Sequence, residues 1–314
     1  MKLSILYRGP LSSCNYGCIY CPFAKRRESR QELLADRRAL DRFVAWVGLR
    51  STDSISVFFT PWGEALIRRS YQRALAELTS MPHVRRAAIQ TNLSAPLDWV
   101  ERCDKAKLAL WTTFHPTEVS RARFVKKALE LVFRGVRFSA GVVGLREHFD
   151  AIEALRRELP PEVYVWVNAY RRDGNSYTED EVRRLLAVDP LFRVNTREYP
   201  SRGEACRAGS EVISVAGDGT ARRCHFIEEP IGNIYEDGFE SRLVERPCSN
   251  ATCRCHIGYV HLDYLELDKV FGAGILQRIP EGWPGNVKMP SAALFTNAPK
   301  EPASPRRRLS LLSI

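Results

Sequence analysis

The stretch CNYGCIYC, residues 14–21, places Cys14, Cys18 and Cys21 within eight residues, directly after a β-rich run at Leu3–Tyr7. Three thiolates this close together can wrap one iron–sulfur cluster and leave its fourth iron without a protein ligand. An open iron is a site where a small molecule can coordinate. A zinc knuckle is the alternative, but zinc prefers four ligands and cysteine pairs spaced by two residues. The spacing therefore favours a cluster-binding loop at the end of a first strand.

Beyond this loop, β-rich runs alternate with helical patterns up to about residue 170. Further strands are expected at Ser54–Thr60, Val84–Thr91, Leu108–Phe114, Val136–Val143 and Val163–Ala169. Residues 117–133 are expected to form a helix that begins at the N-cap Thr117 and buries the stripe Val125, Ala128, Leu129 and Val132. Six successive strand–helix units predict an α/β fold with a parallel sheet, either open and doubly wound or curled into a barrel. Loops at the carboxyl ends of the strands would then carry the chemistry.

The composition is that of a globular protein, with 45% hydrophobic and 27% charged residues among 314. No run approaches the ~18 apolar residues that a membrane-spanning helix needs, and the first residues resemble neither a secretory signal nor a lipidation site. A cytoplasmic protein without a membrane partner is expected. The chain has nine cysteines, an odd number that cannot all pair, and thiols in the cytoplasm are kept reduced. Metal ligation is therefore favoured over a disulfide framework.

The net charge of +10 raises the alternative of a nucleic-acid-binding protein. Residues 273–314 contribute six Lys/Arg against two Asp/Glu, so +4 of that charge lies in this last segment. Lys25-Arg26-Arg27 and Arg306-Arg307-Arg308 would be the phosphate contacts. No aromatic platform for single strands accompanies these basic runs, so nucleic acid remains a secondary alternative.

The pattern changes after about residue 200, where helical periodicity fades and five of the nine cysteines occur. Val212–Val215 and Thr220–Cys224 flank Gly217-Asp218-Gly219, which predicts a β-hairpin. We expect an α/β domain over residues 1–198 and a small cysteine-held module over 199–272. Residues 273–314 hold six of the 18 prolines and the run SPRRRLSLL, which indicates a poorly ordered basic tail.

The CxxxCx(aromatic)C loop after the first strand resembles the defining motif of the radical S-adenosylmethionine (SAM) superfamily. The resemblance covers about residues 1–170 and implies a partial (β/α)6 TIM-like barrel. It implies that Cys14, Cys18 and Cys21 hold a [4Fe–4S] cluster whose open iron is chelated by S-adenosylmethionine (AdoMet). An electron from that cluster would then cleave AdoMet to a 5′-deoxyadenosyl radical. Tyr20 occupies the family's aromatic position and would lie beside the adenine.

Weaker motifs of the family suggest further AdoMet contacts. Trp62-Gly63-Glu64 resembles the GGE motif, in which backbone carbonyls and the acid receive the AdoMet ammonium. Ala140–Glu147 resembles the GxIxGxxE motif that packs the adenine, which assigns this role to Val142 and Gly144. In each case an ordinary turn, with a solvated Glu64 in the first, is the alternative.

Four other positions near the strand ends are candidates by their place in the expected barrel. Thr113 would lie near the AdoMet carboxylate or ribose, Arg123 would pair with the carboxylate, and Asn168 points toward the same mouth. His115 replaces an acidic residue of the family and is the candidate proton acceptor, because the pKa of a histidine is ordinarily near neutrality. Helix capping, turn capping or solvation of the arginine is the alternative for each.

The second cysteine set, Cys206-x12-Gly219-x4-Cys224, resembles the opening of the SPASM or shorter twitch extensions, which hold auxiliary [4Fe–4S] clusters. Cys248, Cys253 and Cys255 follow, and two of these three would complete the ligand set. Nine cysteines leave too few thiolates for a second auxiliary cluster, so one is expected. A structural zinc bound by four of these thiolates is the alternative.

The resemblance therefore implies a radical SAM enzyme with a twitch/SPASM-like module and one auxiliary cluster. Relatives of this layout modify peptide or protein side chains, which is the expected activity, or oxidise a small alcohol or amine, which is the alternative. RNA modification is a second alternative. The expected partners are an electron donor such as flavodoxin or ferredoxin and a peptide, protein or small-molecule substrate.

Overall fold

The computed structural model describes residues 1–23, 26–171 and 176–291. Lys25, Arg306-Arg307-Arg308 and residues 292–314 of the expected tail lie outside the described residues. The strands are β1 (Lys2–Arg8), β2 (Ser54–Phe59), β3 (Val84–Thr91), β4 (Leu108–Phe114), β5 (Arg137–Val143), β6 (Tyr164–Asn168), β7 (Tyr199–Pro200), β8 (Val212–Ala216), β9 (Thr220–Arg222), β10 (Pro230–Asn233) and β11 (Thr252–Cys253). The helices are α1 (Arg30–Gly48), α2 (Arg69–Ser80), α3 (Arg121–Phe133), α4 (Phe149–Glu158), α5 (Glu179–Leu186), α6 (Phe192–Asn195), α7 (His256–Tyr259) and α8 (Leu267–Phe271).

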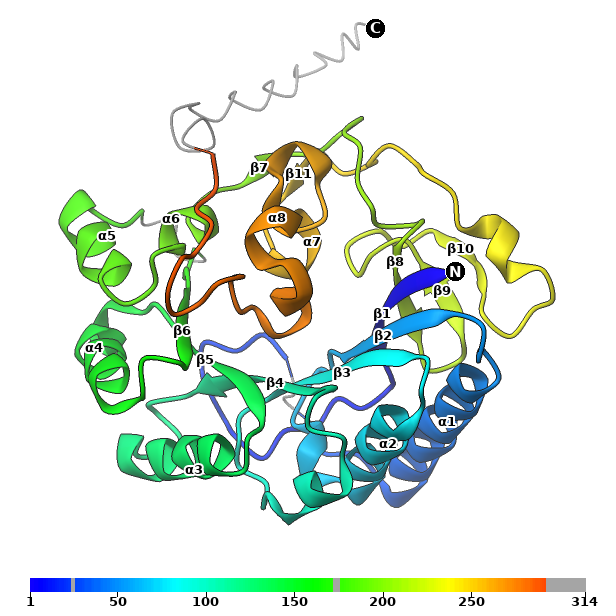
Figure 1. Ribbon diagram of the computed structural model, residues 1–314, viewed down its shortest axis with the longest axis horizontal. Coiled ribbons are helices and arrows are strands. Elements are labelled where there is room, and N and C mark those ends of the chain that lie inside the picture. The colour runs from blue at the N-terminus through cyan, green and yellow to red at the C-terminus, as the bar shows by residue number, and fades with distance from the viewer. Residues whose placement is uncertain (24–25, 172–175, 292–314) are drawn as a thin grey trace, which may run out of the picture.

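The described residues form one curved sheet of nine strands in the order β10-β9-β8-β1-β2-β3-β4-β5-β6 (Figure 1). Strands β1 to β6 are parallel and follow one another in chain order, which is the arrangement of a partial barrel. All six strand bounds agree with those expected from the sequence to within one residue. The parallel α/β fold is therefore confirmed.

Side chains alternate between two cores along each strand. Ile5, Val57 and Ile89 belong to the core between the sheet and the outer helices, which include α1 to α4 (Figure 1). Leu6 and Phe58 point to the concave side and belong to a second core. The buried runs of β1 and β2 are therefore apolar on both faces, as a covered parallel sheet requires.

Helix α3 differs in detail from the expected helix. Its N-cap is Ser120, whose side chain accepts a hydrogen bond from the Arg123 amide, so Thr117 lies outside the helix. Its buried residues are Phe124, Val125, Ala128 and Leu131. The predicted stripe was therefore wrong at two positions: Leu129 and Val132 are 42% and 41% exposed. The stripe is rotated because Phe124 packs inward against Phe114 of β4.

The predicted hairpin is present, but it continues the barrel sheet. Strand β8 pairs in parallel with β1, and β9 returns antiparallel to β8. The turn between them contains Gly219 with a φ of +90°, where its amide donates to the Ala216 carbonyl at 3.0 Å. The cysteine-bearing segment is thus joined to the barrel edge next to β1.

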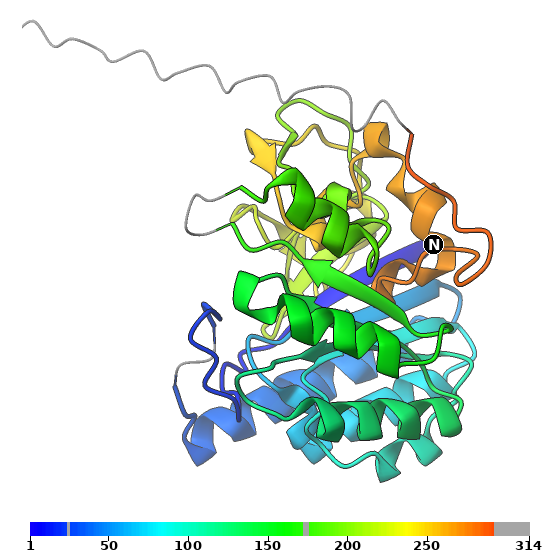
Figure 2. The ribbon, with the colours of Figure 1, turned by 90° about the vertical axis from the view of Figure 1, so that its left-hand side faces the viewer.

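The C-terminal segment fills the concave side of the barrel, as both views show (Figures 1 and 2). Tyr259, Leu276 and Ile279 pack there against inward side chains of the strands. Trp283 lies 4.9 Å from Tyr164 of β6, ring centroid to centroid. The tail expected from residue 273 therefore begins as packed structure, because its apolar residues meet a concave surface that the local sequence does not reveal.

Within the described ranges, no helix combines the length and apolar character needed to cross a bilayer.

Candidate functional site

A cavity of about 320 Å³ opens at the carboxyl ends of the parallel strands, and the CNYGCIYC loop forms part of its wall. Cys14, Cys18 and Cys21 all line it, and all three are free thiols. Burial raises the pKa of Cys18 to about 11, so this thiol carries a proton at neutral pH in the metal-free protein. Metal binding would release that proton. Three thiols converging on one cavity fit a cofactor larger than a single ion.

The loop is held in place by hydrogen bonds to side chains of three other segments. Glu28 accepts hydrogen bonds from the Ser12 and Ser13 amides, and Glu118 accepts one from the Gly17 amide at 3.0 Å. Asn92, just after β3, donates from Nδ2 to Asn15 at 3.0 Å. These contacts fix the loop before any ligand binds, since they satisfy backbone amides that a flexible loop would leave to water.

Gly63 lies directly beneath the loop, where no side chain fits. A Cβ atom at this position would lie 1.8 Å from the carbonyl oxygen of Ser13. The adjacent amide of Glu64 donates to that same carbonyl at 3.1 Å. The end of β2 and the cysteine loop are therefore joined backbone to backbone, which explains a glycine here without a positive φ.

Glu64 is 2% exposed and lines the same cavity. Its carboxylate accepts hydrogen bonds from the Leu66 amide at 3.0 Å, from Thr91 Oγ1 at 2.9 Å and from the Asn92 amide at 2.5 Å. Burial raises the pKa of Glu64 to about 7 despite these donors. The solvated-turn alternative for Glu64 is therefore wrong. The carboxylate ties the end of β2 to the end of β3, and its three accepted hydrogen bonds leave about one lone pair for a ligand.

His115 lies at the end of β4 and lines the cavity. Its Nδ1 atom is 2.9 Å from Tyr20 Oη and 3.4 Å from Cys18 Sγ. Burial lowers the pKa of His115 to about 4, so the near-neutral value expected from the sequence is wrong for this environment. The imidazole is neutral at pH 7 and contacts the loop that carries the cysteines.

The cofactor-binding candidates divide into two groups. Gly63, Glu64, Thr113 and Asn168 line the cavity. Tyr20, Arg123, Val142 and Gly144 do not.

The second group is displaced for identifiable reasons. Tyr20 is buried between the rings of His115 and His148, behind the cavity wall. Val142 points into the core under the outer helices, and its neighbour Val143 lines the cavity in its place, because successive strand residues face opposite sides. Arg123 is exposed on α3, where it lies close enough to Tyr16 to influence the pKa of its hydroxyl.

The cavity also contains residues that the sequence did not assign to it. Trp111 of β4 and Trp166 of β6 form an aromatic wall, with ring centroids 5.3 Å apart. Cys255, His256 and Arg278 enter from the C-terminal segment. Gly141 of β5 is the one related feature of the sequence. A Cβ atom at this position would lie 2.0 Å from the Trp166 ring, so the indole requires a glycine beside it. No local signal marks Arg278, which comes from the stretch expected to be tail.

The cysteines of the second set lie close enough together to influence one another's pKa values. Cys206 and Cys248 both raise the pKa of Cys224, after the larger effect of burial, and Cys248 also raises that of Cys206. Burial raises the pKa of Cys253 to about 12, with further contributions from the other four thiols. Cys206, Cys224, Cys248 and Cys253 therefore lie near one another, and Cys255 lies near Cys253 as well as in the wall of the first cavity.

Backbone and arginine contacts hold these four segments together. The Cys248 amide donates to Glu204 at 3.1 Å, and Cys248 in turn accepts from the Gly203 amide at 2.8 Å. Arg223, buried next to Cys224, donates to the carbonyl oxygens of Arg246 and Pro247. Across the described ranges, no three His, Cys, Asp or Glu side chains are gathered tightly enough to bind a single metal ion.

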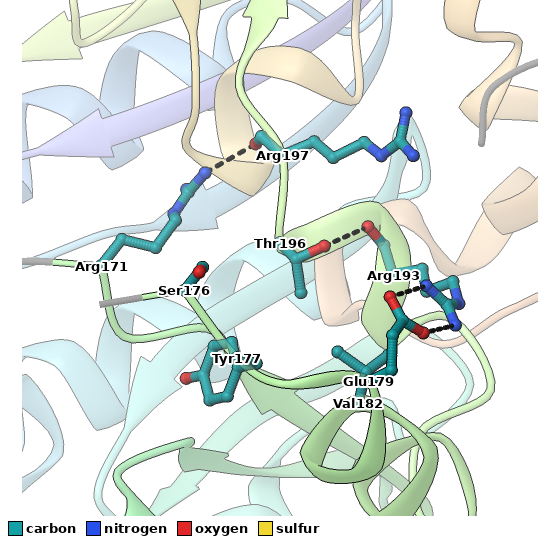
Figure 3. Close-up of a pocket in the computed structure, with 8 residues that line it drawn as sticks. All are labelled: Arg171, Ser176, Tyr177, Glu179, Val182, Arg193, Thr196 and Arg197. Atoms are coloured by element: carbon teal, nitrogen blue, oxygen red, sulfur yellow. Dashed lines mark hydrogen bonds and ion pairs between the residues drawn. The ribbon is translucent and has the colours of Figure 1, made fainter. Parts of the chain in front are cut away.

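A second cavity of about 370 Å³ lies beyond β6 and contains none of the predicted site residues (Figure 3). Its charged groups contact one another: Arg193 pairs with Glu179 through two hydrogen bonds of 2.7 and 3.4 Å. Arg171 donates to the carbonyl oxygen of Arg197 at 2.6 Å. The first cavity is therefore the candidate site.

No protein-family model and no curated protein matches the chain. Solved structures do match: anSMEcpe with bound AdoMet superposes over 78% of this chain and 80% of that chain, with a TM-score of 0.52 and 13% sequence identity. A structure of native anSMEcpe with bound AdoMet and the Kp18Cys peptide matches over 77% of this chain and 82% of that chain, with a TM-score of 0.50 and 12% identity. Identities this low concern the fold alone. The chain therefore shares the fold of anSMEcpe, a partial barrel of six consecutive parallel strands, and carries its CxxxCxxC loop after the first strand.

Proposed function

We propose that the protein is a radical SAM enzyme that reductively cleaves AdoMet and abstracts hydrogen from a substrate held in the 320 Å³ cavity. The observation that carries this proposal is the convergence of Cys14, Cys18 and Cys21 with Glu64 on that cavity. When bound by the three thiolates, a [4Fe–4S] cluster with one open iron supplies the electron that converts AdoMet to the 5′-deoxyadenosyl radical. The remaining chemistry of the site is binding, orientation and exclusion of water.

Each wall of the cavity has a part in holding AdoMet. Glu64 supplies a carboxylate to the AdoMet ammonium, and its raised pKa is lowered again when that cation binds beside it. Thr113 and Asn168 offer a hydroxyl and an amide to the carboxylate and ribose. Trp111 and Trp166 cover one wall of the cavity with ring surface, which limits the access of water to the reacting groups.

The second proposed cofactor is an auxiliary [4Fe–4S] cluster held by Cys206, Cys224, Cys248 and Cys253. The support is their mutual influence on one another's pKa values and the count of four, which is the usual ligand number of such a cluster. Cys255 is left out of this set because it lines the other cavity. A zinc ion on the same four thiolates is the competing proposal.

For the substrate we favour a peptide or protein side chain, with two-electron oxidation of a small alcohol or amine as the alternative. An auxiliary cluster suits both, since it can accept the electron that remains on a substrate radical. A flavodoxin or ferredoxin is the proposed electron donor. RNA modification is the weakest of the candidates, since no aromatic platform for single strands accompanies the basic runs of the sequence.

The test is product analysis on anaerobically reconstituted protein. Incubation with AdoMet and dithionite is expected to yield 5′-deoxyadenosine without added substrate, because cleavage needs only AdoMet and an electron. Replacing Cys14, Cys18 and Cys21 together with Ala should abolish the product. Cys103→Ala is the matched control, since that thiol lies buried in the core at the end of a short helix. Equal product from the triple variant would refute the proposal.

A further inference from the structure

Arg278 is a buried cation in the candidate site that has no anionic partner. The residue is 4% exposed and lines the cavity of the CNYGCIYC loop. Its guanidinium carbon lies 4.5 Å from the ring centroid of Trp166 and 5.7 Å from that of Trp111. Among the described residues, it forms no ion pair and donates no side-chain hydrogen bond. A buried guanidinium with five unused donors is costly unless a ligand supplies acceptors.

The backbone holds Arg278 at this position. Ser139 of β5 donates from its hydroxyl to the Gln277 carbonyl at 2.5 Å and accepts from Trp166 Nε1 at 3.0 Å. The Ile279 amide donates to the Gly274 carbonyl at 3.0 Å, and a Cβ on Gly274 would lie 1.9 Å from the Ile279 carbonyl oxygen. Arg278 itself has a φ of +53°, a conformation that a non-glycine residue rarely adopts. The strands thus fix both the arginine and the indole beneath it.

The nearest buried acid does not neutralise this charge directly. Burial raises the pKa of Asp189, and Arg278 acts against this by lowering it. The Asp189 carboxylate accepts hydrogen bonds from Tyr164 Oη at 2.5 Å and from the Val167 and Leu191 amides at 2.9 and 3.0 Å. It forms no ion pair with Arg278 within the part of the chain that the structure describes. The guanidinium therefore keeps its donors for the cavity.

A second polar group at this end of the cavity is also unused. His256 is 6% exposed, lines the cavity and lies 5.5 Å from Trp111, ring centroid to centroid. Its Nε2 atom is buried and has no hydrogen-bond partner. Unpartnered buried polar atoms are uncommon in folded proteins and require an explanation. The unpartnered Nε2 of His256 and the unpaired guanidinium of Arg278 therefore border the same aromatic wall.

We propose that Arg278 and His256 form the substrate-recognition end of the cavity, and that the substrate is an organic anion. Its carboxylate or phosphate group would bind the Arg278 guanidinium, and an adjoining apolar or aromatic part would lie against Trp111 and Trp166. Planar guanidinium donors match both anions through paired hydrogen bonds. The inference rests on the proposed function, because it assigns this end of the cavity to the substrate and leaves the other end to AdoMet. For a peptide substrate, the anion would be an acidic side chain or a terminal carboxylate.

The test is calorimetric titration of anaerobically reconstituted, AdoMet-loaded protein with three probes: 3-phenylpropionate, its neutral amide 3-phenylpropionamide, and phenyl phosphate. The wild-type protein is expected to bind at least one of the two anions about 10–100-fold more tightly than the amide, which is the range for a hydrogen-bonded charge pair. The tighter anion identifies the substrate group. Arg278→Gln should abolish the preference, Arg278→Lys should keep part of it, and the exposed Arg37→Gln should keep all of it.

Three results would overturn the proposal. They are equal binding of anions and amide by the wild-type protein, no binding of either anion at millimolar concentration, and an unchanged preference in Arg278→Gln. Arg278→Gln should also leave the dissociation constant of AdoMet unchanged. A parallel loss of AdoMet affinity, with competition between AdoMet and the probes, would assign Arg278 to the AdoMet carboxylate instead. Probe binding is measured independently of AdoMet cleavage, so a protein that binds anions but forms no 5′-deoxyadenosine would contradict the proposed function alone.

Discussion

At the scale of single residues, Glu64 has two roles that can be separated. It ties the ends of β2 and β3 through three accepted hydrogen bonds, and it offers a carboxylate to the cavity. Glu64→Gln keeps the size of the side chain but removes its charge. We expect AdoMet affinity to fall about 10–150-fold, since an ionic hydrogen bond contributes about 1.5–3 kcal/mol, while iron content stays the same.

Equilibrium dialysis of AdoMet against the reconstituted variant measures this effect, and iron analysis accompanies it. The exposed Glu77→Gln on α2 is the matched control. Unaltered AdoMet affinity in Glu64→Gln would leave the residue with its structural role only.

Asp36 of α1 gives a pH dependence to stability. It is 3% exposed and accepts hydrogen bonds from the Leu11 amide at 3.2 Å and from Tyr71 Oη at 3.1 Å, yet burial raises its pKa from 3.8 to about 6. A carboxyl group whose pKa is raised by folding stabilises the folded state below its unfolded pKa, and that contribution is lost as the pH rises through the folded value. The contribution of Asp36 to stability should therefore be lost between about pH 4 and pH 6.

Asp36→Asn keeps an acceptor oxygen and cannot ionise. At pH 7 and above it should be about 1–3 kcal/mol more stable than the wild-type protein, and the difference should shrink toward pH 5. Thermal unfolding of the anaerobic protein between pH 5 and pH 8 measures this difference. A constant difference across that range would show that Asp36 is not the titrating group.

At the scale of elements, the strands could be predicted from the sequence, but the packing of the C-terminal segment against the concave side of the sheet could not. The runs that became β1 to β6 are rich in β-branched and aromatic residues, so their positions follow from local sequence. The helix stripe on α3 was misplaced because Leu129 and Val132 are apolar but point outward. The CNYGCIYC loop was recognisable because its three cysteines lie close together in the sequence, at a spacing typical of a cluster-binding loop.

The opposite wall of the site could not be predicted, because it is assembled over long sequence distances. Arg278 meets Trp111 and Trp166 only after the C-terminal segment has returned to the concave face. The chain also returns to this face with Cys255, which lines the cavity although the sequence grouped it with Cys206.

The packing of the C-terminal segment leads to a prediction about truncation. A chain ending at Phe271 would lose Leu276 and Ile279, which are 5% and 7% exposed, and with them about 3–6 kcal/mol of burial. We expect it to unfold at a markedly lower temperature than a chain ending at Ser291, or to fail to fold. Thermal unfolding of the two chains makes the comparison. Equal stability would mean that residues 272–291 do not complete the inner core.

At the scale of the whole molecule, the two cysteine sets lie in different places and should bind separate cofactors. Two [4Fe–4S] clusters predict about 8 irons per chain. The Cys14→Ala, Cys18→Ala, Cys21→Ala variant should keep about 4 irons, held by the set that includes Cys206 and Cys224. A Cys206→Ala, Cys224→Ala variant should keep the other irons, which the CNYGCIYC loop holds, and should still cleave AdoMet. One zinc per chain in the iron-free triple variant would instead identify the second site as a structural clip.

The most direct measurement is electron paramagnetic resonance of the reduced Cys206→Ala, Cys224→Ala variant, in which the CNYGCIYC loop holds the remaining cluster. Spectra are recorded with and without AdoMet. If the loop leaves one iron open to the cavity, adding AdoMet should change the signal of the reduced cluster, and 5′-deoxyadenosine should follow on turnover. A cluster signal that AdoMet leaves unaltered would contradict the account.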